Sequence, residues 1–580
     1  SVALVSGGVR RTTSTVRVVS AVLLVVSTLV WVSGSPVGAW SSDDRAVAVF
    51  GSTSDSDYGR SVAVDSSGNV YTTGWFYNTV DFDPGAGTAN LTADSGYDVF
   101  VSKLDSSGDL VWAKNFGGTE YAKGFSVAVD SSGNVYTTGD FRGTVDFDPG
   151  AGTANLTSNG SNDAFVLKLD SSGNYVWAKS WGSSDVGVAN ADDASYSVAV
   201  DSSGNVYTTG GFRNTVDFDP GAGTTEFTSA GGGTAMDLFV SKLDSAGDLV
   251  WARSFGDTGG DVGKSVALDS SGNVYTTGSF VGTVDFDPDP LEIANLVNDD
   301  YWGDVFVSKL DSSGNYVWAK QFGGASSGQG NSVVVDSSGN VYTTGDFEGT
   351  VDFDPGAGTV NLSSADSEDV FVSKLDSAGD LVWAKSFGGT RIDFGTSVAV
   401  DSSGNVYTTG WFQGTGDFDP GAGTTNLTTN GSTVGDDVFV SKLDSAGDLV
   451  WAKSFGGAEY SFYGSDDRGY SVAVDSSGNV YITGQFLGTV DFDPGAGTTE
   501  FTSSEYSFIW RNDVFVLRLD STGNLGTVVP AGFTLSTTSV SVAESGTTAQ
   551  FTVVLDAEPA GDVVIWSASS DSGEAQVGAQ

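Results

Sequence analysis

The chain has 580 residues and a formal charge of −48, from 73 acidic against 25 basic residues, and this excess of acid argues against a nucleic acid partner because phosphates would be repelled. Hydrophobic residues make up 39% of the chain and glycine contributes 80 residues, which is the composition of a folded, turn-rich protein rather than a disordered one. Histidine and cysteine are absent, which excludes Ser-His-Asp and Cys-His nucleophiles, disulfides, and zinc sites with the usual ligands.

Residues 1–39 have the pattern of a secretory signal peptide. Three arginines precede the apolar run Val18–Val32, and small residues end the segment at Ala39. An uncleaved membrane anchor is the alternative, but fifteen apolar residues are short of the ~20 that a spanning helix needs. We therefore expect cleavage after Ala39, an exported mature chain without a membrane span, and, since no initiating methionine is present, a sequence that is a fragment.

One motif, SVAVDSSGNVYTTG, recurs along the chain with few changes. Its seven copies are 65 to 74 residues apart, which is the spacing of a repeat protein. The copies begin at Ser61, Ser126, Ser197, Ser265, Ser332, Ser397 and Ser471.

Each unit reads as four strands with turns between them. In the first unit SVAV and NVYTTGWF flank the turn DSSG, and DVFVSKL and LVWAKNF flank DSSGD. Four strands taken seven times without a helical pattern predict an all-β fold, a seven-bladed β-propeller of four-stranded blades over residues 61–530. A linear solenoid is the alternative, although seven units are a number at which a ring closes.

The amino-terminal segment 40–60 is predicted to close the ring. The seventh unit has Thr527 where six others have tryptophan, so it lacks a convincing fourth strand. The missing strand is supplied by AVAVFGS, Ala46–Ser52, which aligns with the WAKSFGG type of segment. Pairing it with the last blade removes two exposed strand edges.

The repeats resemble the bacterial SBBP family of seven-bladed β-propeller repeats over Ser61 to about Thr527. The resemblance is carried by VDSSGNVYTTG, DVFVSKLDSSG and VDFDPGAGT. It implies a secreted or surface-displayed propeller, usually part of a larger multidomain protein, with no activity established for the repeat and no catalytic residue.

Residues 531–580 have a different pattern and form a separate predicted domain. Their alternating strands look like the first half of a Calx-β-like or immunoglobulin-like sandwich, a partial β-sandwich that ends at Gln580. In that family the position of Glu544 can be a calcium ligand. The later acidic loops that would complete such a site are missing.

Five aspartates recur in every unit, in the first one Asp65, Asp81, Asp83, Asp98 and Asp105, and together they account for 35 of the 73 acidic residues. The charge is therefore largely architectural. Asp65 and Asp105 begin DSSG turns, where a carboxylate accepts hydrogen bonds from backbone N–H groups two residues on. Asp98 opens the third strand and is interpreted in the same way.

The DFDPG loop has two interpretations. Its paired carboxylates and loop carbonyls are the beginning of a calcium cage, which needs six to eight oxygens, and the alternative is a corner built by Asx turns. Paired carboxylates also serve glycoside hydrolysis, but seven equivalent copies favour a scaffold. The candidate metal ligands are Asp81, Asp83, Asp146, Asp148, Asp217, Asp219, Asp285, Asp287, Asp352, Asp354, Asp417, Asp419, Asp491 and Asp493.

Six tryptophans recur in the fourth strand, each four residues after a glycine. The pattern resembles the docking motif of quinoprotein propellers, where a tryptophan packs between blades, although here the aspartate stands three residues before the glycine rather than four. Core packing is favoured over cofactor stacking. The residues are Trp112, Trp177, Trp251, Trp318, Trp383 and Trp451.

Two segments break the repeat symmetry and are the predicted ligand site. They are Gly456–Tyr470, which enters the seventh unit, and Ser503–Asp513 inside it, and both are expected on one face of the ring. An alternative is that their aromatic residues only pack the loops against the ring. The candidate ligand-binding residues are Tyr460, Phe462, Tyr463, Tyr470, Tyr506, Phe508, Trp510, Arg468 and Arg511.

These patterns predict a secreted or cell-surface propeller that acts as a non-catalytic binding or display module for glycans or surface partners. A propeller enzyme acting on carbohydrate through carboxylates is the alternative, followed by a quinoprotein-like dehydrogenase. We expect a monomeric propeller with no required cofactor, and calcium stays open.

Overall fold

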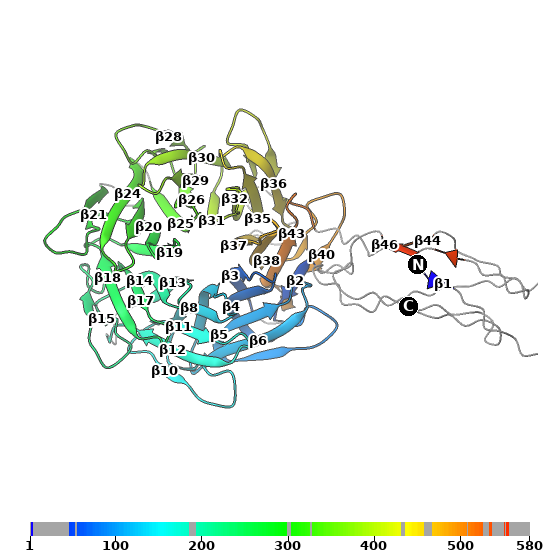
Figure 1. Ribbon diagram of the computed structural model, residues 1–580, viewed down its shortest axis with the longest axis horizontal. Helices are drawn as coiled ribbons and strands as arrows, with labels where there is room; N and C mark the ends of the chain where they lie inside the picture. Colours follow the sequence, from blue (N-terminus) through cyan, green and yellow to red (C-terminus); the bar gives the residue numbers. More distant parts are fainter. Residues whose placement is uncertain are drawn as a thin grey trace, which may run out of the picture. The chain divides into compact units, whose positions relative to one another are not determined.

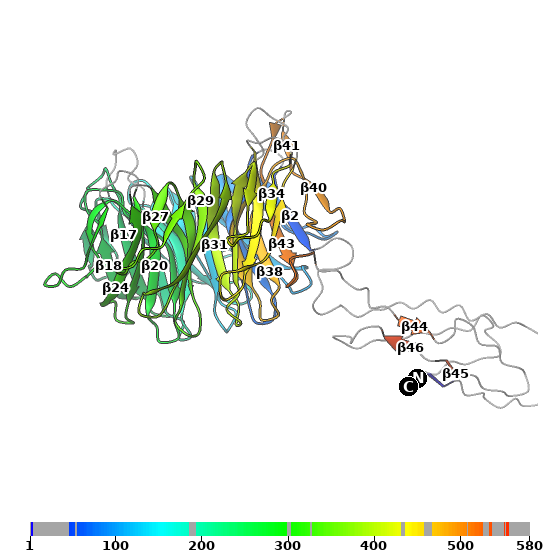
Figure 2. The same cartoon turned by 90° about the horizontal axis from the view of Figure 1, so that it is seen from above.

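The computed structural model describes residues 46–52, 55–184, 193–298, 303–324, 327–430, 435–457, 467–506 and 509–525, together with short strands at 2–3, 533–535, 550–551 and 553–555. Residues 44–526 form one compact unit, and residues 1–43 with 527–580 form a second. The first unit is a ring of seven antiparallel sheets, and its described residues contain strands and no helix (Figures 1 and 2). This confirms the predicted seven-bladed β-propeller.

Every blade has the same order of four strands from the axis outwards. The inner strands contact those of the neighbouring blades and surround the axis (Figure 1). The inner strands are β3 (Tyr58–Val64), β7 (Ala122–Val129), β13 (Ala194–Val200), β19 (Val262–Leu268), β25 (Gly328–Val335), β31 (Asp393–Val400) and β37 (Arg468–Val474). The second strands are β4 (Val70–Asp81), β8 (Val135–Phe141), β14 (Val206–Phe212), β20 (Val274–Phe280), β26 (Val341–Phe347), β32 (Val406–Gln413) and β38 (Val480–Phe486).

The third and outer strands complete the blades. The third strands are β5 (Asn90–Leu104), β11 (Asp163–Leu169), β17 (Asp237–Leu243), β23 (Asp304–Leu310), β29 (Asp369–Leu375), β35 (Asp436–Leu443) and β43 (Asp513–Leu519). Six outer strands follow in sequence: β6 (Leu110–Gly118), β12 (Tyr175–Trp181), β18 (Leu249–Phe255), β24 (Tyr316–Gly324), β30 (Leu381–Gly389) and β36 (Leu449–Phe455).

The outer strand of the seventh blade comes from the amino-terminal end of the propeller. Strand β2 (Val47–Phe50) pairs antiparallel with β43, with Val47 opposite Leu517 and Phe50 opposite Val514. This is the place that the sequence predicted for Ala46–Ser52. The seventh blade is therefore completed by a strand from the amino-terminal end of the propeller sequence, and β43 is paired on both sides.

A ring of hydrogen bonds explains the repeated serine of SVAV. In each blade the serine hydroxyl oxygen accepts a hydrogen bond from the backbone N–H of the valine one residue further along the motif in the next blade, over 3.1 to 3.2 Å. The series closes on itself, since Val62 in the first blade donates to Ser471 in the seventh.

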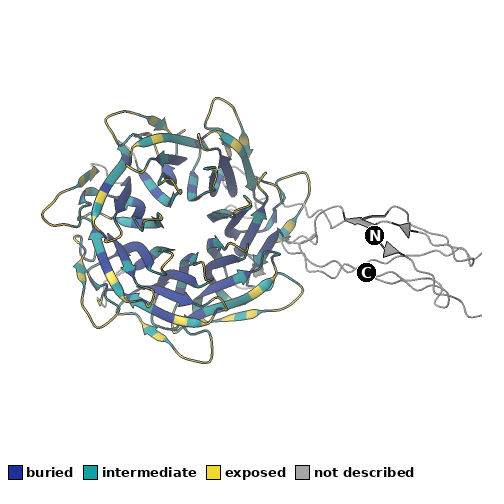
Figure 3. Cartoon of the chain, in the orientation of Figure 1, coloured by how far each residue is buried: buried dark blue, intermediate teal, exposed yellow. Residues whose placement is uncertain are grey.

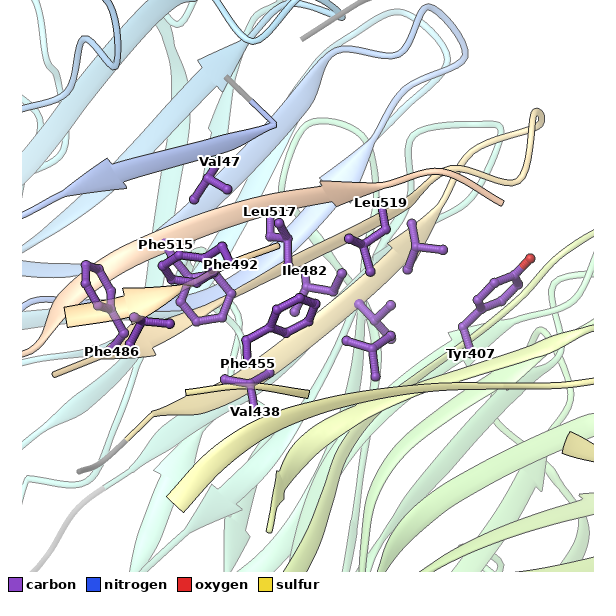
Figure 4. Close-up of a cluster of buried hydrophobic side chains, with 14 of the residues drawn as sticks. Val47, Tyr407, Val438, Phe455, Ile482, Phe486, Phe492, Phe515, Leu517 and Leu519 are labelled. Carbon is purple, nitrogen blue, oxygen red and sulfur yellow. The ribbon is translucent and has the colours of Figure 1, made fainter. Parts of the chain in front are cut away.

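The hydrophobic core lies in layers between neighbouring blades, and burial is greatest on the second and third strands (Figure 3). One layer brings Val438 and Phe455 of the sixth blade against Ile482, Phe486 and Phe515 of the seventh (Figure 4). The first seven residues of second strands such as β4 (VYTTGWF) and β8 (VYTTGDF) are buried because they are covered on both faces, so burial there is continuous rather than alternating.

The acidic DFDPG segment, expected as a loop, is a β-hairpin that extends each blade. In the first blade it belongs to the long strands β4 and β5. In the others it forms β9 (Thr144–Asp146) with β10 (Asn155–Thr157), β15 (Thr215–Asp217) with β16 (Glu226–Thr228), β21 (Gly282–Asp285) with β22 (Asn295–Asn298), β27 (Thr350–Asp352) with β28 (Asn361–Ser363), β33 (Thr415–Asp417) with β34 (Asn426–Thr428), and β39 (Thr489–Asp491) with β40 (Glu500–Thr502). Several of these hairpins also pair with the outer strand of the preceding blade.

Other strands are short. The seventh blade carries an extra hairpin of β41 (Glu505–Tyr506) and β42 (Ile509–Trp510). In the second unit β1 (Val2–Ala3) pairs with β45 (Gln550–Phe551), and β44 (Phe533–Leu535) pairs with β46 (Val553–Leu555). The rest of the predicted signal peptide and sandwich, Glu544 included, lies outside the described residues. Among the described residues we find no helix long and apolar enough to span a membrane.

Candidate functional site

The DFDPG hairpin uses its carboxylates to fix its own backbone. Asp81 Oδ1 accepts hydrogen bonds from the N–H groups of Asp83 (3.1 Å) and Ala89 (2.7 Å), and Asp83 Oδ1 accepts one from Gly85 (2.7 Å). The other Asp83 oxygen fills the space beside Gly87, where a Cβ atom would lie 2.0 Å from it.

The phenylalanine between the two aspartates anchors the hairpin. Phe82 is fully buried and its ring centroid lies 4.9 Å from that of Phe100 and 5.3 Å from that of Phe50. The same three backbone hydrogen bonds recur in all seven units. In the part of the chain that the structure describes, these aspartates form no cluster of three or more acidic ligands. The geometry is that of an Asx-turn corner.

The DSSG aspartates are turn formers. Asp65 Oδ1 accepts from the N–H groups of Ser67 (2.8 Å) and Asn69 (3.0 Å), while Oδ2 accepts from the Asn69 amide and the Tyr71 hydroxyl. Partial burial opposes ionisation of Asp65, but these hydrogen bonds, led by the Asn69 side chain, outweigh it and lower the pKa.

The recurring tryptophans bind the next blade. Each indole N–H donates to the carbonyl oxygen of a turn residue in the following blade, for instance Trp177 to Ser245 over 3.1 Å. The indole of Trp112 also covers Gly173, where a Cβ atom would lie 2.9 Å from the ring. This arrangement is inter-blade packing, the interpretation that the sequence favoured.

Another set of aspartates joins neighbouring blades, and we call them the clamp residues. The sequence did not predict this role. Five units carry a buried aspartate four residues before the SVAV serine. In the seventh blade Asp467 accepts one hydrogen bond from Gly457, at the end of the preceding outer strand, over 2.9 Å and one from Leu487, after β38, over 2.7 Å. The five residues are Asp57, Asp193, Asp261, Asp393 and Asp467.

These clamp residues face the aspartate that opens a third strand. A Cβ atom at Gly388 would lie 2.6 Å from Asp393 Oδ2 and 2.7 Å from Asp369 Oδ1, so the two oxygens flank the same backbone. Burial, together with the charge of Asp369, raises the pKa of Asp393 to about 8. Burial and the charge of Asp57 likewise raise the pKa of Asp513 to about 8.

One of the positions at which the blades differ is a β-bulge. In all seven blades the pairing between the inner and second strands shifts at the residue immediately before the SVAV serine. A bulge leaves one residue outside the ladder and re-aims its side chain. These residues, which we name the bulge ring, are Arg60, Phe125, Tyr196, Lys264, Asn331, Thr396 and Tyr470.

One half of the bulge ring is a chain of aromatic and cationic contacts that crosses the blade boundaries. The Arg60 guanidinium carbon lies 4.0 Å from the ring centroid of Tyr470 and 5.4 Å from that of Trp75. The ring of Phe125 lies 5.8 Å from Trp75 and 5.4 Å from Tyr196, centroid to centroid. Residues of blades seven, one, two and three therefore form one surface.

The other half is polar. Lys264 Nζ lies 4.7 Å from the Tyr196 ring centroid, and its charge also acts on Asp346. The Asn331 amide donates to Asp346 Oδ1 over 2.8 Å and to the Gly395 carbonyl over 2.9 Å. Burial raises the pKa of Asp346 to about 7.

Thr396 completes the circle by donating to the carbonyl of Gly469, next to Tyr470, over 2.8 Å. All seven bulge residues are half-buried, so each keeps part of its side chain in contact with solvent. Together they present cationic, aromatic, amide and hydroxyl groups around the axis, which suits a ligand with both apolar faces and polar edges.

Three of the predicted ligand-site residues are described in full. Tyr470 belongs to the bulge ring, and its hydroxyl donates to Gln485 Oε1 over 2.9 Å. Arg468 forms an ion pair with Asp436 over 2.6 Å and lies 4.7 Å from the Trp411 ring centroid. Arg511 is half-buried, and its backbone N–H donates to Ser504. Tyr460, Phe462, Tyr463 and Phe508, and the side chains of Tyr506 and Trp510, lie outside the described residues.

Sequence reasoning missed six of the seven bulge residues. The sequence did contain a signal. The SVAV serine is the same in all seven units, while the residue before it takes six different identities. It was not noticed because the variable residue precedes the motif and reads as the end of a loop.

The seven blades match the SBBP β-propeller repeat model at residues 50–75, 111–140, 186–210, 250–279, 317–346, 382–415 and 450–485. The protein is an SBBP β-propeller repeat protein. The match and the ring confirm the predicted repeat family and fold class.

Two relatives are similar in sequence to this SBBP propeller. The uncharacterized WD repeat-containing protein L264 of Acanthamoeba polyphaga mimivirus is 24% identical over an alignment of 493 residues, which covers 73% of this chain and 34% of that protein. The regulatory protein FlaEY of Caulobacter vibrioides is 30% identical over 176 residues, 30% of this chain and 17% of that protein. The chain thus spans about a third and a sixth of their lengths, and their activities are not carried over.

Solved structures give weaker matches to the SBBP propeller. Sqt1 from Chaetomium thermophilum has a TM-score of 0.35 and 10% identity, over 84% of this chain and 100% of that one. Regucalcin, a calcium-binding protein from Agrobacterium tumefaciens, has a TM-score of 0.27 and 9% identity, over 63% of this chain and 85% of that one. TM-scores this low carry no argument about function.

Proposed function

We propose that this SBBP propeller is a non-catalytic binding module and that its ligand, a glycan, binds at the bulge ring. The observation that carries the proposal is the contrast between seven nearly identical units and the six residue types found at their bulges. A scaffold repeats its side chains wherever the packing repeats, whereas a ligand site breaks that symmetry.

The chemistry of the ring supports a sugar ligand. Trp75, Phe125 and Tyr196 give adjoining aromatic surfaces, and tyrosine and tryptophan combine an apolar face with a polar edge. On the other side of the ring the side-chain oxygens of Asn331 and Thr396 add acceptors, because the N–H and O–H groups of these residues already donate within the propeller. Sugar rings have matching apolar faces and hydroxyl edges. A surface protein that carries such a glycan would bind at the same place.

A carboxylate-dependent glycosidase remains the alternative, followed by a quinoprotein-like dehydrogenase. A glycosidase needs an acid and a nucleophile about 5–9 Å apart in unlike environments. The DFDPG aspartates instead share one environment in seven copies, which favours the binding module. The tryptophans donate to the next blade, which favours packing over cofactor stacking.

The proposal also places the protein outside the cell, on the grounds of the signal-like segment 1–39, and treats 531–580 as the start of a Calx-β-like sandwich beside a monomeric propeller. Expression of the full chain with mass spectrometry of its amino terminus tests the first of these. We expect the exported protein to begin at Trp40, and an unprocessed Ser1 would contradict export by this segment.

The binding proposal is tested on glycan arrays and chromogenic glycosides with the purified chain. We expect binding without hydrolysis, and a loss of about tenfold or more in Tyr196→Ala, because aromatic anchors dominate such contacts. Tyr175→Ala is the matched control, since Tyr175 is also half-buried but lies on the outer strand β12. Hydrolysis of a glycoside, or equal binding by both variants, would contradict the proposal.

A further inference from the structure

We infer that the ligand at the bulge ring carries an anionic group, a carboxylate or sulfate on a sugar, held by Arg60 and Lys264. The inference rests on the proposed glycan-binding function and specifies the ligand class. Its starting point is the placement of two basic residues at the axis of a chain with three times as many acidic as basic residues.

Neither cation has a carboxylate partner within ion-pair distance among the described residues. The ion pairs of the described part of the propeller join other residues, such as Arg142 with Glu120 and Arg468 with Asp436. Arg60 and Lys264 instead lie against the Tyr470 and Tyr196 rings.

The two cations act on each other across the ring. Burial lowers the pKa of Lys264, and the charge of Arg60 lowers it further, while Asp346 opposes the change. Arg60 and Lys264 belong to the same bulge ring, and like charges on one ring without an ion-pair partner are unfavourable, so an anion bound by both would relieve them. Asp346 does not fill this role alone, since burial raises its pKa to about 7 and Asn331 occupies one of its oxygens.

The contacts also hold the cations in position for a ligand. The guanidinium of Arg60 lies against the rings of both Tyr470 and Trp75, and these contacts limit its rotamers before binding. A planar guanidinium binds carboxylates and sulfates through two parallel hydrogen bonds, and a lysine adds a point charge. The neighbouring Phe125 and Tyr196 would then contact the sugar ring that carries the anion.

The experiment compares acidic and neutral sugars by calorimetry on the full chain. The probes are a trigalacturonide, a sulfated galactotriose and unmodified galactotriose, at low and at physiological salt. We expect one acidic probe to bind about tenfold or more tightly than the neutral one and to weaken with salt. The carboxylated and sulfated arms distinguish the two anion types.

Two pairs of variants locate the effect. Arg60→Gln and Lys264→Gln should each reduce the preference for the acidic probe by about tenfold, because each removes one charge-assisted contact. Lys179→Gln and Lys320→Gln are matched controls, since these outer lysines lie 3.8 and 3.9 Å from their carboxylate partners. Circular dichroism confirms that all four variants are folded.

A second readout does not need a glycan. At fixed ionic strength, sulfate should raise the melting temperature of the wild-type chain more than that of the Arg60→Gln, Lys264→Gln double variant, because only the former has the anion site. If neutral sugars bind as tightly as acidic ones and the variants respond alike to sulfate, the anion site is wrong and the glycan proposal stands. If sulfate distinguishes the variants but no sugar binds, the anion site stands and the glycan proposal fails.

Discussion

The DFDPG hairpins keep the same side chains in all seven blades, whereas the bulge ring keeps the same backbone and varies its side chains. Every DFDPG hairpin buries the same phenylalanine and closes the same three backbone hydrogen bonds, even in the fourth unit, where DPDPLEI replaces the usual DPGAGT sequence. At the bulge ring the backbone is constant and the side chain changes from blade to blade. The comparison teaches that side chains that are constant between blades stabilise the propeller, while those that vary are available to bind a ligand.

The largest expected effect comes from removing the strand that closes the ring. Deletion of Ala46–Ser52 should leave β43 with an unpaired edge and uncover core residues such as Leu517 and Phe515. We expect a lower melting temperature and aggregation, seen by calorimetry and size-exclusion chromatography. A monomeric deletion variant with the wild-type melting temperature would show that closure is not needed.

The next largest effect is the difference in stability between removing a phenylalanine of the DFDPG hairpin and removing one of the bulge ring. Phe82→Ala should cost about 3–5 kcal/mol of unfolding free energy, because it removes a fully buried ring from the hairpin anchor. Phe125→Ala should cost clearly less, since that bulge residue is half-buried. Urea unfolding of both variants measures the difference, and equal losses would remove the distinction between anchor and recognition surface.

A smaller effect concerns the buried carboxylate pairs. Burial raises the pKa of Asp369 to about 7 and that of Asp393 to about 8, so their protons are bound more tightly in the folded state than in the unfolded one. The stability that they contribute is therefore complete below the usual aspartate pKa and is lost as the pH rises from about 4 to 8. The melting temperature should increase from pH 8 to pH 5.

Asp369→Asn tests this origin of the pH dependence. Asp369 Oδ1 is buried without a hydrogen-bond partner, and an amide nitrogen in its place could donate to Asp393 as a protonated carboxyl would. The variant should lose on the order of 2 kcal/mol of the change between pH 8 and pH 5. A pH profile identical to that of the wild type would assign the dependence to net charge instead.

The smallest expected effect is that of calcium on the hairpins. Asp81 Oδ1 and Asp83 Oδ1 already accept backbone N–H groups, so we expect calcium to change the melting temperature no more than magnesium does at equal ionic strength. A ligand that binds only the folded state raises stability with its concentration. A specific increase in melting temperature with calcium, lost in Asp81→Asn, would show that the DFDPG hairpins bind calcium.

The repeats allowed most of the fold to be predicted from the sequence. Strand and turn patterns in SVAVDSSGNVYTTG gave the blade, and the missing tryptophan at Thr527 indicated that another segment must supply a strand. The role of Asp65 also followed from local turn chemistry, because its hydrogen-bond partners lie within six residues along the chain.

The contacts between blades could not be predicted in this way. Asp467 joins residues from two blades, and Arg60 meets Tyr470 from the opposite end of the propeller sequence. Such contacts depend on ring closure and on the bulge that re-aims each side chain, and neither leaves a local spacing rule in the sequence. For six of the seven bulge residues, the variable position before the serine was the signal that the sequence offered.

The central claim is tested most directly by making the bulge ring symmetric. Thr396 already donates to the next blade's carbonyl, so threonine at the other six bulge positions is compatible with the backbone. We predict that a chain with threonine at all seven positions keeps the propeller fold and a melting temperature near that of the wild type, and loses all binding on the glycan array. Wild-type binding by this symmetric ring would contradict the account.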